Sequence, residues 1–139
     1  RVFVTDRRNQ RIEIYHPDTG LRLGKMGDGG GTYDHPPMLD PQQLFLPAGL
    51  SWDDSQQAIL VADGFNMLAR AWSNPDNTPI NVNGQIQPNY LGHWLETSLG
   101  TRPGGLFDAE QIASGGGHTF VFSLISNRIT RFEWQELNQ

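Results

Sequence analysis

Three histidines are the side chains in this sequence that could together bind a transition metal. His35, His93 and His118 lie in well-separated segments, and imidazole nitrogens are common ligands of zinc and copper. They could meet at one ion only if repeated units brought equivalent loops to a common axis. No His-x-His or His-Glu-x-x-His spacing supports such a site. The sequence therefore favours three separate histidines and leaves zinc as an alternative.

Two polar loops could supply oxygen ligands for calcium. Asp28 lies in DGGG at 28–31, and Asp76 lies in NPDNTPINVNG at 74–84. Calcium takes about six to eight oxygen ligands, often from one short loop with alternating acidic residues. Neither loop has that density of acidic residues. We therefore expect no metal or other cofactor, with calcium as a second alternative.

A small cluster of arginines opens the chain. Arg7, Arg8 and Arg11 lie in VTDRRNQRIEIY at 4–15, whereas the whole chain has a net charge of −5. Nucleic-acid binding requires a basic surface that can face the phosphate backbone, so the charge argues against nucleic acid as a partner. We expect Arg7 and Arg8 to lie at the solvated end of a hairpin. The alternative is a small basic patch that binds an acidic protein or RNA, which keeps both residues as candidates for contact with a partner.

Other catalytic groups are missing from the sequence. The chain has no cysteine, which excludes a cysteine nucleophile, a thiolate metal site and a disulfide, and leaves the redox compartment open. No serine lies in a nucleophile elbow, and no phosphate-binding glycine motif precedes a helix. No apolar run approaches the roughly 18 residues of a membrane span, so we expect none.

The segment that contains the arginines recurs twice along the chain. VTDRRNQRIEIY at 4–15 corresponds to VADGFNMLARAW at 61–72 and to VFSLISNRITRF at 121–132. Each copy begins with an apolar strand, turns through a short, mostly polar stretch, and returns as a strand that ends on an aromatic residue. Internal repeats of this kind indicate a fold built from equivalent units.

Further short strands surround the copies. A strand near 49–52 precedes the second copy and one near 111–113 precedes the third, while 20–27 and 88–95 each supply a strand after a copy. Strands of four to seven residues separated by Gly, Pro, Asn or Asp indicate antiparallel β-structure, and no helical periodicity competes. The sequence therefore predicts an all-β fold whose units have four antiparallel strands, as in β-propeller blades.

The order of residues within a unit resembles the blades of NHL-repeat propellers. LFLPAGL at 44–50 is followed by Val-Ala-Asp at 61–63, then Asn66, an aromatic residue and a glycine. The closest match is VTDRRNQRIEIYHPDTG at 4–20, where the family positions are filled by Asp6, Asn9, Arg11, Ile12 and Gly20. The third copy departs, because Ser123 replaces the aspartate and Ala109-Glu110-Gln111 replaces the Pro-x-Gly element. The resemblance implies NHL-like blades.

The chain is expected to hold an incomplete ring. Residues 1–27 would form a partial blade, 44–95 a full blade and 106–135 a second partial blade, all in one propeller segment of residues 1–139. Propellers typically have about four to eight blades, and natural proteins avoid exposed sheet edges. The expected partner is therefore protein, either the rest of a larger propeller or another chain that covers the open edges.

Two acid–base pairs are expected to hold the hairpins together. Asp6 and Arg11 flank the first hairpin turn, and Asp63 takes the same place in the second copy. Arg70 lies two residues beyond the aligned arginine position, on the same strand face, and could substitute for it. Candidates for contact with a partner lie at a turn, in a long connection or on an aromatic strand: Arg7, Arg8, Tyr33, His35 and Trp94.

Two functional classes stay open at this point. The first is a non-catalytic scaffold that binds a protein or assembles into a larger structure. The missing catalytic constellation, the incomplete ring and the long connections favour it. The second is part of a metal-dependent propeller enzyme, similar to the amidating lyases or the lactonases, with zinc or calcium ligands that lie partly outside this segment. Resemblance to a fold does not choose between them.

Overall fold

A computed structural model of the chain describes residues 1–27, 40, 43–73, 83–95, 106 and 108–139. Within these residues the strands form three antiparallel sheets, which confirms the predicted all-β fold. The first sheet contains β1 (Val2–Asp6), β2 (Arg11–Tyr15) and β3 (Arg22–Met26). The second contains β4 (Pro47–Asp53), β5 (Ala58–Asp63), β6 (Leu68–Ser73) and β7 (Tyr90–Trp94), and the third contains β8 (Ala109–Gly115), β9 (His118–Ser123) and β10 (Arg128–Glu133). The described sheets do not close into a ring.

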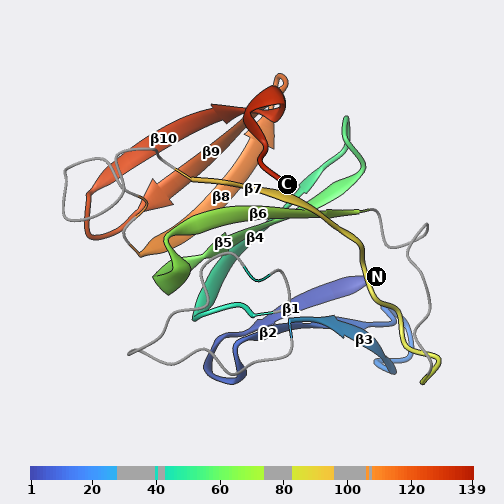
Figure 1. Cartoon of the computed structure of the whole chain (residues 1–139). Helices are drawn as coiled ribbons and strands as arrows, with labels where there is room; N and C mark the ends of the chain where they lie inside the picture. Colours follow the sequence, from blue (N-terminus) through green and yellow to red (C-terminus); the bar gives the residue numbers. More distant parts are fainter. Residues whose placement is uncertain (28–39, 41–42, 74–82, 96–105, 107) are drawn as a thin grey trace.

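Strands that are consecutive in the chain pair with each other throughout each sheet. Figure 1 shows the three sheets as successive layers in chain order, with the second sheet in the middle. We call the face of a sheet that points toward the following sheet its front face, and the opposite face its back face. The described helical turns are short, η1 (Arg7–Asn9), η2 (Gly64–Asn66) and η4 (Trp134–Glu136); no helix in this part of the chain is long and apolar enough to cross a membrane.

The second sheet is buried on both faces because another sheet packs on each side of it. Side chains alternate along a strand, so neighbouring residues point into different clusters. On β5, Ile59 and Val61 belong to the apolar cluster shared with the first sheet, whereas Leu60 belongs to the cluster shared with the third. The first cluster consists of Ile12, Ile14, Met26, Leu44, Ile59, Val61 and Trp72. The second consists of Ala58, Leu60, Ala62, Ala69, Ala71, Trp94, Leu106, Ala109, Ile112, Val121 and Phe132.

The three copies of the repeated segment share one hairpin geometry. Each turn ends on a residue with positive φ, at Gln10 (57°), Met67 (58°) and Asn127 (49°). In each, the N–H of that residue donates to the carbonyl three residues earlier, at 3.1–3.2 Å. The strands therefore correspond as the sequence repeat predicts. β1 is equivalent to β5 and β9, and β2 is equivalent to β6 and β10.

The strand before the second hairpin also has a counterpart before the third. Leu46 (φ 51°) and Asp108 (φ 53°) adopt the same left-handed conformation just before β4 and β8. Both strands then contain an irregularity, between Pro47 and Leu50 and between Ala109 and Gln111. These two strands are thus equivalent, although the third copy lacks the Pro-x-Gly sequence.

The outer strands β3 and β7 are each covered by a segment from the following unit. Ile86, which follows β6, forms a bridge with Gly24 on β3, and its N–H donates to the Leu23 carbonyl at 2.9 Å. Asn138, which follows β10, exchanges two backbone hydrogen bonds with His93 on β7, at 2.8 and 2.9 Å. Such cover removes part of the exposed edge that would otherwise invite pairing with another chain.

Candidate functional site

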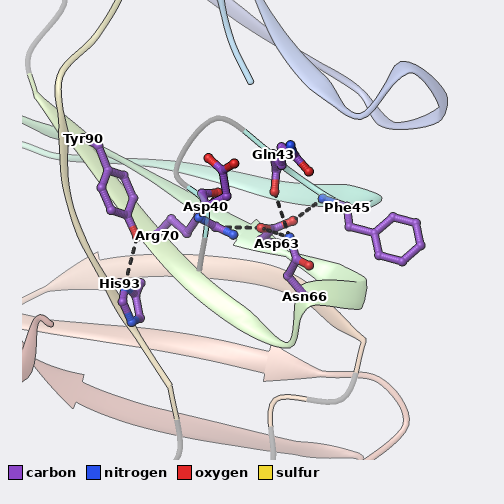
Figure 2. A network of polar contacts seen from close by, with 8 residues as sticks. All are labelled: Asp40, Gln43, Phe45, Asp63, Asn66, Arg70, Tyr90 and His93. Atoms are coloured by element: carbon purple, nitrogen blue, oxygen red, sulfur yellow. Dashed lines mark hydrogen bonds and ion pairs between the residues drawn. The ribbon is translucent and has the colours of Figure 1, made fainter. Parts of the chain in front are cut away.

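A fully buried ion pair lies at the end of the second hairpin. The Arg70 Nε donates to Asp63 Oδ2 at 2.7 Å, and both side chains have no exposed surface. Asp63 also accepts hydrogen bonds from the Asn66 side chain at 2.8 Å and from the backbone N–H of Phe45 at 2.8 Å. Figure 2 shows these contacts around the carboxylate. The buried carboxylate therefore accepts hydrogen bonds from three donors, one on β6, one in η2 and one in the segment that leads into β4.

The same pair ties down the chain that leads into β4. Arg70 Nη1 donates to the Asp40 carbonyl at 2.9 Å, and the Asn66 amide donates to the Gln43 carbonyl at 3.0 Å. Burial raises the pKa of Asp63, while Arg70, Asn66 and the Phe45 N–H act against that rise. The pair and its neighbours therefore hold the second hairpin against the segment that leads into β4.

Tyr90 and His93 extend this cluster along β7. The Tyr90 hydroxyl lies 2.9 Å from His93 Nδ1, and the Arg70 guanidinium lies 5.9 Å from the centre of the Tyr90 ring (Figure 2). Burial, and then the positive charge of Arg70, lower the pKa of His93. Burial also raises the pKa of Tyr90. Because Nδ1 is hydrogen-bonded to Tyr90, only Nε2 of His93 is left as a metal ligand.

The histidines singled out in the sequence do not form a metal site among the described residues. His93 lies on β7, while His118 lies on β9 with Nε2 3.6 Å from Glu133 Oε1. No group of three or more His, Asp or Glu side chains in the described ranges could hold a metal ion. His35, Tyr33, Asp28 and Asp76 lie outside the described residues.

Asp6 and Arg11 lie across the first hairpin as directly paired residues. Arg11 Nε is 3.3 Å from Asp6 Oδ2 and 2.6 Å from Glu13 Oε1. The Asn9 amide donates to both oxygens of Asp6, at 2.9 and 3.0 Å. Asp6 keeps the position of Asp63 in the repeat, but Glu13 stands at the position of Arg70. In the first sheet the arginine therefore lies two residues earlier on the strand, where it pairs with both acids.

Arg7 lies in the hairpin turn η1 with its side chain partly exposed, and it also reaches the third sheet. Its guanidinium lies 2.9 Å from Glu110 Oε1 and 3.5 Å from Asp108 Oδ1. Burial and the neighbouring Glu110 raise the pKa of Asp108, against the effect of Arg7. Arg8, the other arginine of the turn, is exposed.

These charges border a cleft where β1, β4 and β8 come together. Its volume is about 280 Å³, and its walls are formed by Thr5, Arg7, Pro47, Ala48, Glu110 and Gln111. Thr5 Oγ1 donates to the Ala48 carbonyl at 2.9 Å across this junction. Arg7 pairs with both Glu110 and Asp108 beside this cleft, so these charged side chains connect the first sheet to the third.

Trp94 is fully buried, which corrects its expected role as a contact for a partner. Its indole N–H donates to the Glu133 carbonyl at 2.9 Å, and its ring packs edge-on against Trp134 at 5.0 Å. The segment after β10 therefore covers this side chain.

The same segment also contacts the end of β4. Trp134 Nε1 donates to Asp53 Oδ2 at 2.9 Å. Burial acts to raise the pKa of Asp53, but hydrogen bonds from Ser55, Trp134 and the backbone lower it overall.

The front face of the third sheet carries exposed apolar side chains that the sequence had not singled out. Phe120 is 37% exposed and Ile129 is 68% exposed. In the repeat they correspond to Leu60 and Ala69, which are buried against the third sheet. Aligning the three copies would have found them, because a residue of buried type recurs at these positions. This face is the strongest candidate for contact with another sheet.

Comparison with known proteins adds no family to these observations. No protein-family model matches the chain, and no curated protein matches it. The arguments about function therefore depend on the geometry of the described residues.

Proposed function

We propose that this chain is a non-catalytic, NHL-like propeller segment that serves as an assembly scaffold, binding protein through the outer faces of its sheets. The observation that carries the proposal is the exposed front face of the third sheet. Phe120 and Ile129 are apolar and exposed at positions that are buried in the interface between the second and third sheets. Exposed apolar side chains on one face of a sheet commonly mark an interaction site.

The charged residues support a scaffold in preference to an enzyme. Asp63 and Arg70 satisfy each other in the core, and Arg7 is paired with Glu110 in the cleft. Catalysis needs a positioned group that can exchange a proton or attack a substrate. In the described part of the chain these charged groups instead connect strands and sheets.

Two measurements test the proposal. Sedimentation velocity over a concentration series should show association that weakens in Ile129→Asp but not in Ile125→Asp. Both isoleucines are 68% exposed, and Ile125 lies in the turn between β9 and β10 rather than on the front face. Association that is equal in both variants would contradict a role for this face.

The second measurement addresses the enzyme alternative. After dialysis against zinc or calcium, elemental analysis should find less than one metal ion per chain. Uptake of one ion per chain, reduced by His93→Gln or His118→Gln, would overturn the non-catalytic proposal and favour a metal-dependent enzyme. Urea unfolding of each variant checks that the fold is intact.

A further inference from the structure

We infer that the front face of the third sheet receives the back face of the first sheet of a second copy of this chain, so that copies pack head to tail. This inference rests on the proposed scaffold function and names the partner of the same face. It follows from two interfaces of the same type that are already formed within one chain.

The first step is the equivalence of the front faces. In the first sheet, Phe3, Ile12 and Ile14 pack in the cluster shared with the second sheet. In the second sheet, the corresponding residues, Leu60, Ala69 and Ala71, pack in the cluster shared with the third. In the third sheet, the corresponding residues are Phe120, Ile129 and Arg131, and all three are exposed.

The second step is the equivalence of the back faces. Ile59, Val61 and Trp72 of the second sheet pack against the first. Val121 and Phe132 of the third sheet pack against the second. At the same positions of the first sheet, Val2 and Val4 are 43% and 45% exposed, and Tyr15 is half-buried. The described part of the chain thus has one uncovered front face and one uncovered back face.

The third step is the chemical match between the two uncovered faces. The back faces that are already covered present β-branched residues at the centre of the strand equivalent to β1, Ile59 and Val61 in one case and Thr119 and Val121 in the other. Val2 and Val4 continue that pattern. On the front face of the third sheet, Phe120 and Ile129 are larger apolar side chains than Leu60 and Ala69 of the second, while the charged Arg131 stands at the position of Ala71. A β-branched back face on a bulkier apolar front face is the pairing already seen between the first and second sheets.

An interface between two different faces is heterologous, so each added copy leaves the same two faces uncovered. Such an assembly closes into a ring if the rotation per copy permits, and otherwise it continues as a filament. In either form, blocking one face should stop growth at that face only. This property separates head-to-tail packing from a symmetric dimer, in which both chains use the same face.

The experiment mixes two variants, each with one face blocked. Ile129→Asp blocks the front face, and Val4→Lys blocks the back face without placing a second carboxylate beside Glu13, the residue paired with Val4. Each variant alone should be monomeric by sedimentation velocity. An equimolar mixture should form a 1:1 dimer and nothing larger, whereas the wild type should form larger species as its concentration rises.

Matched controls carry the same charges away from both faces. Ile125→Asp, and Leu124→Lys at a side chain that is 53% exposed, lie in the turn between β9 and β10 and should assemble like the wild type. If either blocking variant fails to fold by circular dichroism, Ile129→Thr or Val4→Thr replaces it, with weaker but measurable loss of association.

Three results would overturn the inference. They are a wild type that stays monomeric over the whole concentration series, an association that Ile129→Asp abolishes but Val4→Lys leaves unchanged, and a mixture of the two variants that stays monomeric. The second result would indicate symmetric pairing of front faces and would leave the scaffold proposal standing. Binding of one metal ion per chain would instead overturn that proposal, whatever the state of assembly.

Discussion

The Asp63–Arg70 pair and the Asp6–Arg11 pair occupy corresponding hairpins but differ in their surroundings. Both side chains of the first pair are fully buried, while those of the second are 28% and 35% exposed. A buried charge that loses its partner costs far more free energy than an exposed one, because water cannot solvate it. The same type of contact in one repeat is therefore essential to the core and in the other is a surface feature.

This difference gives a prediction at the scale of single residues. Asp63→Asn leaves Arg70 buried without a counter-charge and should lower the free energy of unfolding by about 3–5 kcal/mol. The matched variant Asp6→Asn should lower it by less than about 1 kcal/mol. Urea unfolding followed by tryptophan fluorescence measures both. Equal losses in the two variants would show that burial of the pair does not determine its contribution.

The sequence predicts some of these residues better than others. The spacing of Asp63 and Arg70 across one hairpin is local, so their pairing could be anticipated from the alternation of side chains along a strand. The partners of Arg7 could not, since Asp108 and Glu110 lie about one hundred residues away and no local pattern relates them. The burial of Trp94 could not be anticipated for a similar reason, because the segment that covers it follows β10 of a different sheet.

At the scale of elements, two equivalent glycines let a backbone segment lie close against the outer strands β3 and β7. Gly24 and Gly92 occupy the same position on β3 and β7, opposite Ile14 and Ala71. A Cβ atom would lie 2.1 Å from the Ile86 carbonyl oxygen in one case and 2.4 Å from that of Asn138 in the other. Only glycine allows the following segment to approach the edge of the sheet this closely.

We therefore expect Gly92→Ala to displace the segment that follows β10. Gly92 also has a φ of 148°, which strains any other residue. The substitution should destabilise the protein by about 1–3 kcal/mol, as for other overpacked sites, and should speed exchange of the His93 amide, which donates to Asn138. Hydrogen exchange followed by NMR measures both effects.

Gly115→Ala is the control for this prediction. A Cβ atom at Gly115 would meet nothing within 4 Å, so its exchange pattern should match that of the wild type. Unchanged exchange of the His93 amide in Gly92→Ala would mean that the close backbone approach is not required.

The strands themselves were predictable, and their covering segments were not. Short apolar strands bounded by turn-forming Gly, Asn and Asp mark β5, β6 and β9 in the sequence. By contrast, Ile86 and Asn138 lie in segments without such a pattern, and each forms an isolated bridge. A contact made by one residue produces no repeating pattern in the sequence. The glycines at equivalent positions on β3 and β7 are the sequence feature that indicates the covering segments.

At the scale of the whole molecule, the side chain of Arg7 connects the first and third sheets across the edge of the second through ion pairs with Glu110 and Asp108. Arg7 of the first hairpin reaches Glu110 of β8 beside the cleft lined by Pro47 and Ala48. The side chain of Arg7 is 39% exposed, so solvent screens the interaction and its contribution should be modest. This interaction links two different sheets, so we expect it to affect how the sheets are arranged and to have little effect on the stability of each sheet.

A charge reversal tests this connection. Arg7→Glu should lower the free energy of unfolding by up to about 1 kcal/mol at low salt, and less at high salt. Adding Glu110→Arg should restore part of the loss, which a double-mutant cycle in urea would detect. Arg8→Glu, at the exposed neighbouring arginine, should change little. A similar loss in Arg7→Glu and Arg8→Glu would indicate a general charge effect instead of a specific pair.

The burial of β5 on both faces has a consequence for solubility. A strand between two sheets has no polar side, and residues 58–62 accordingly read AILVA, a run without charge or proline. Short runs of this composition form cross-β aggregates when they are exposed. In the folded chain β5 is hydrogen-bonded to β4 and β6, and both of its faces are covered by other sheets. The packing of the three sheets thus covers residues 58–62 and prevents the aggregation that this segment would cause if it were exposed.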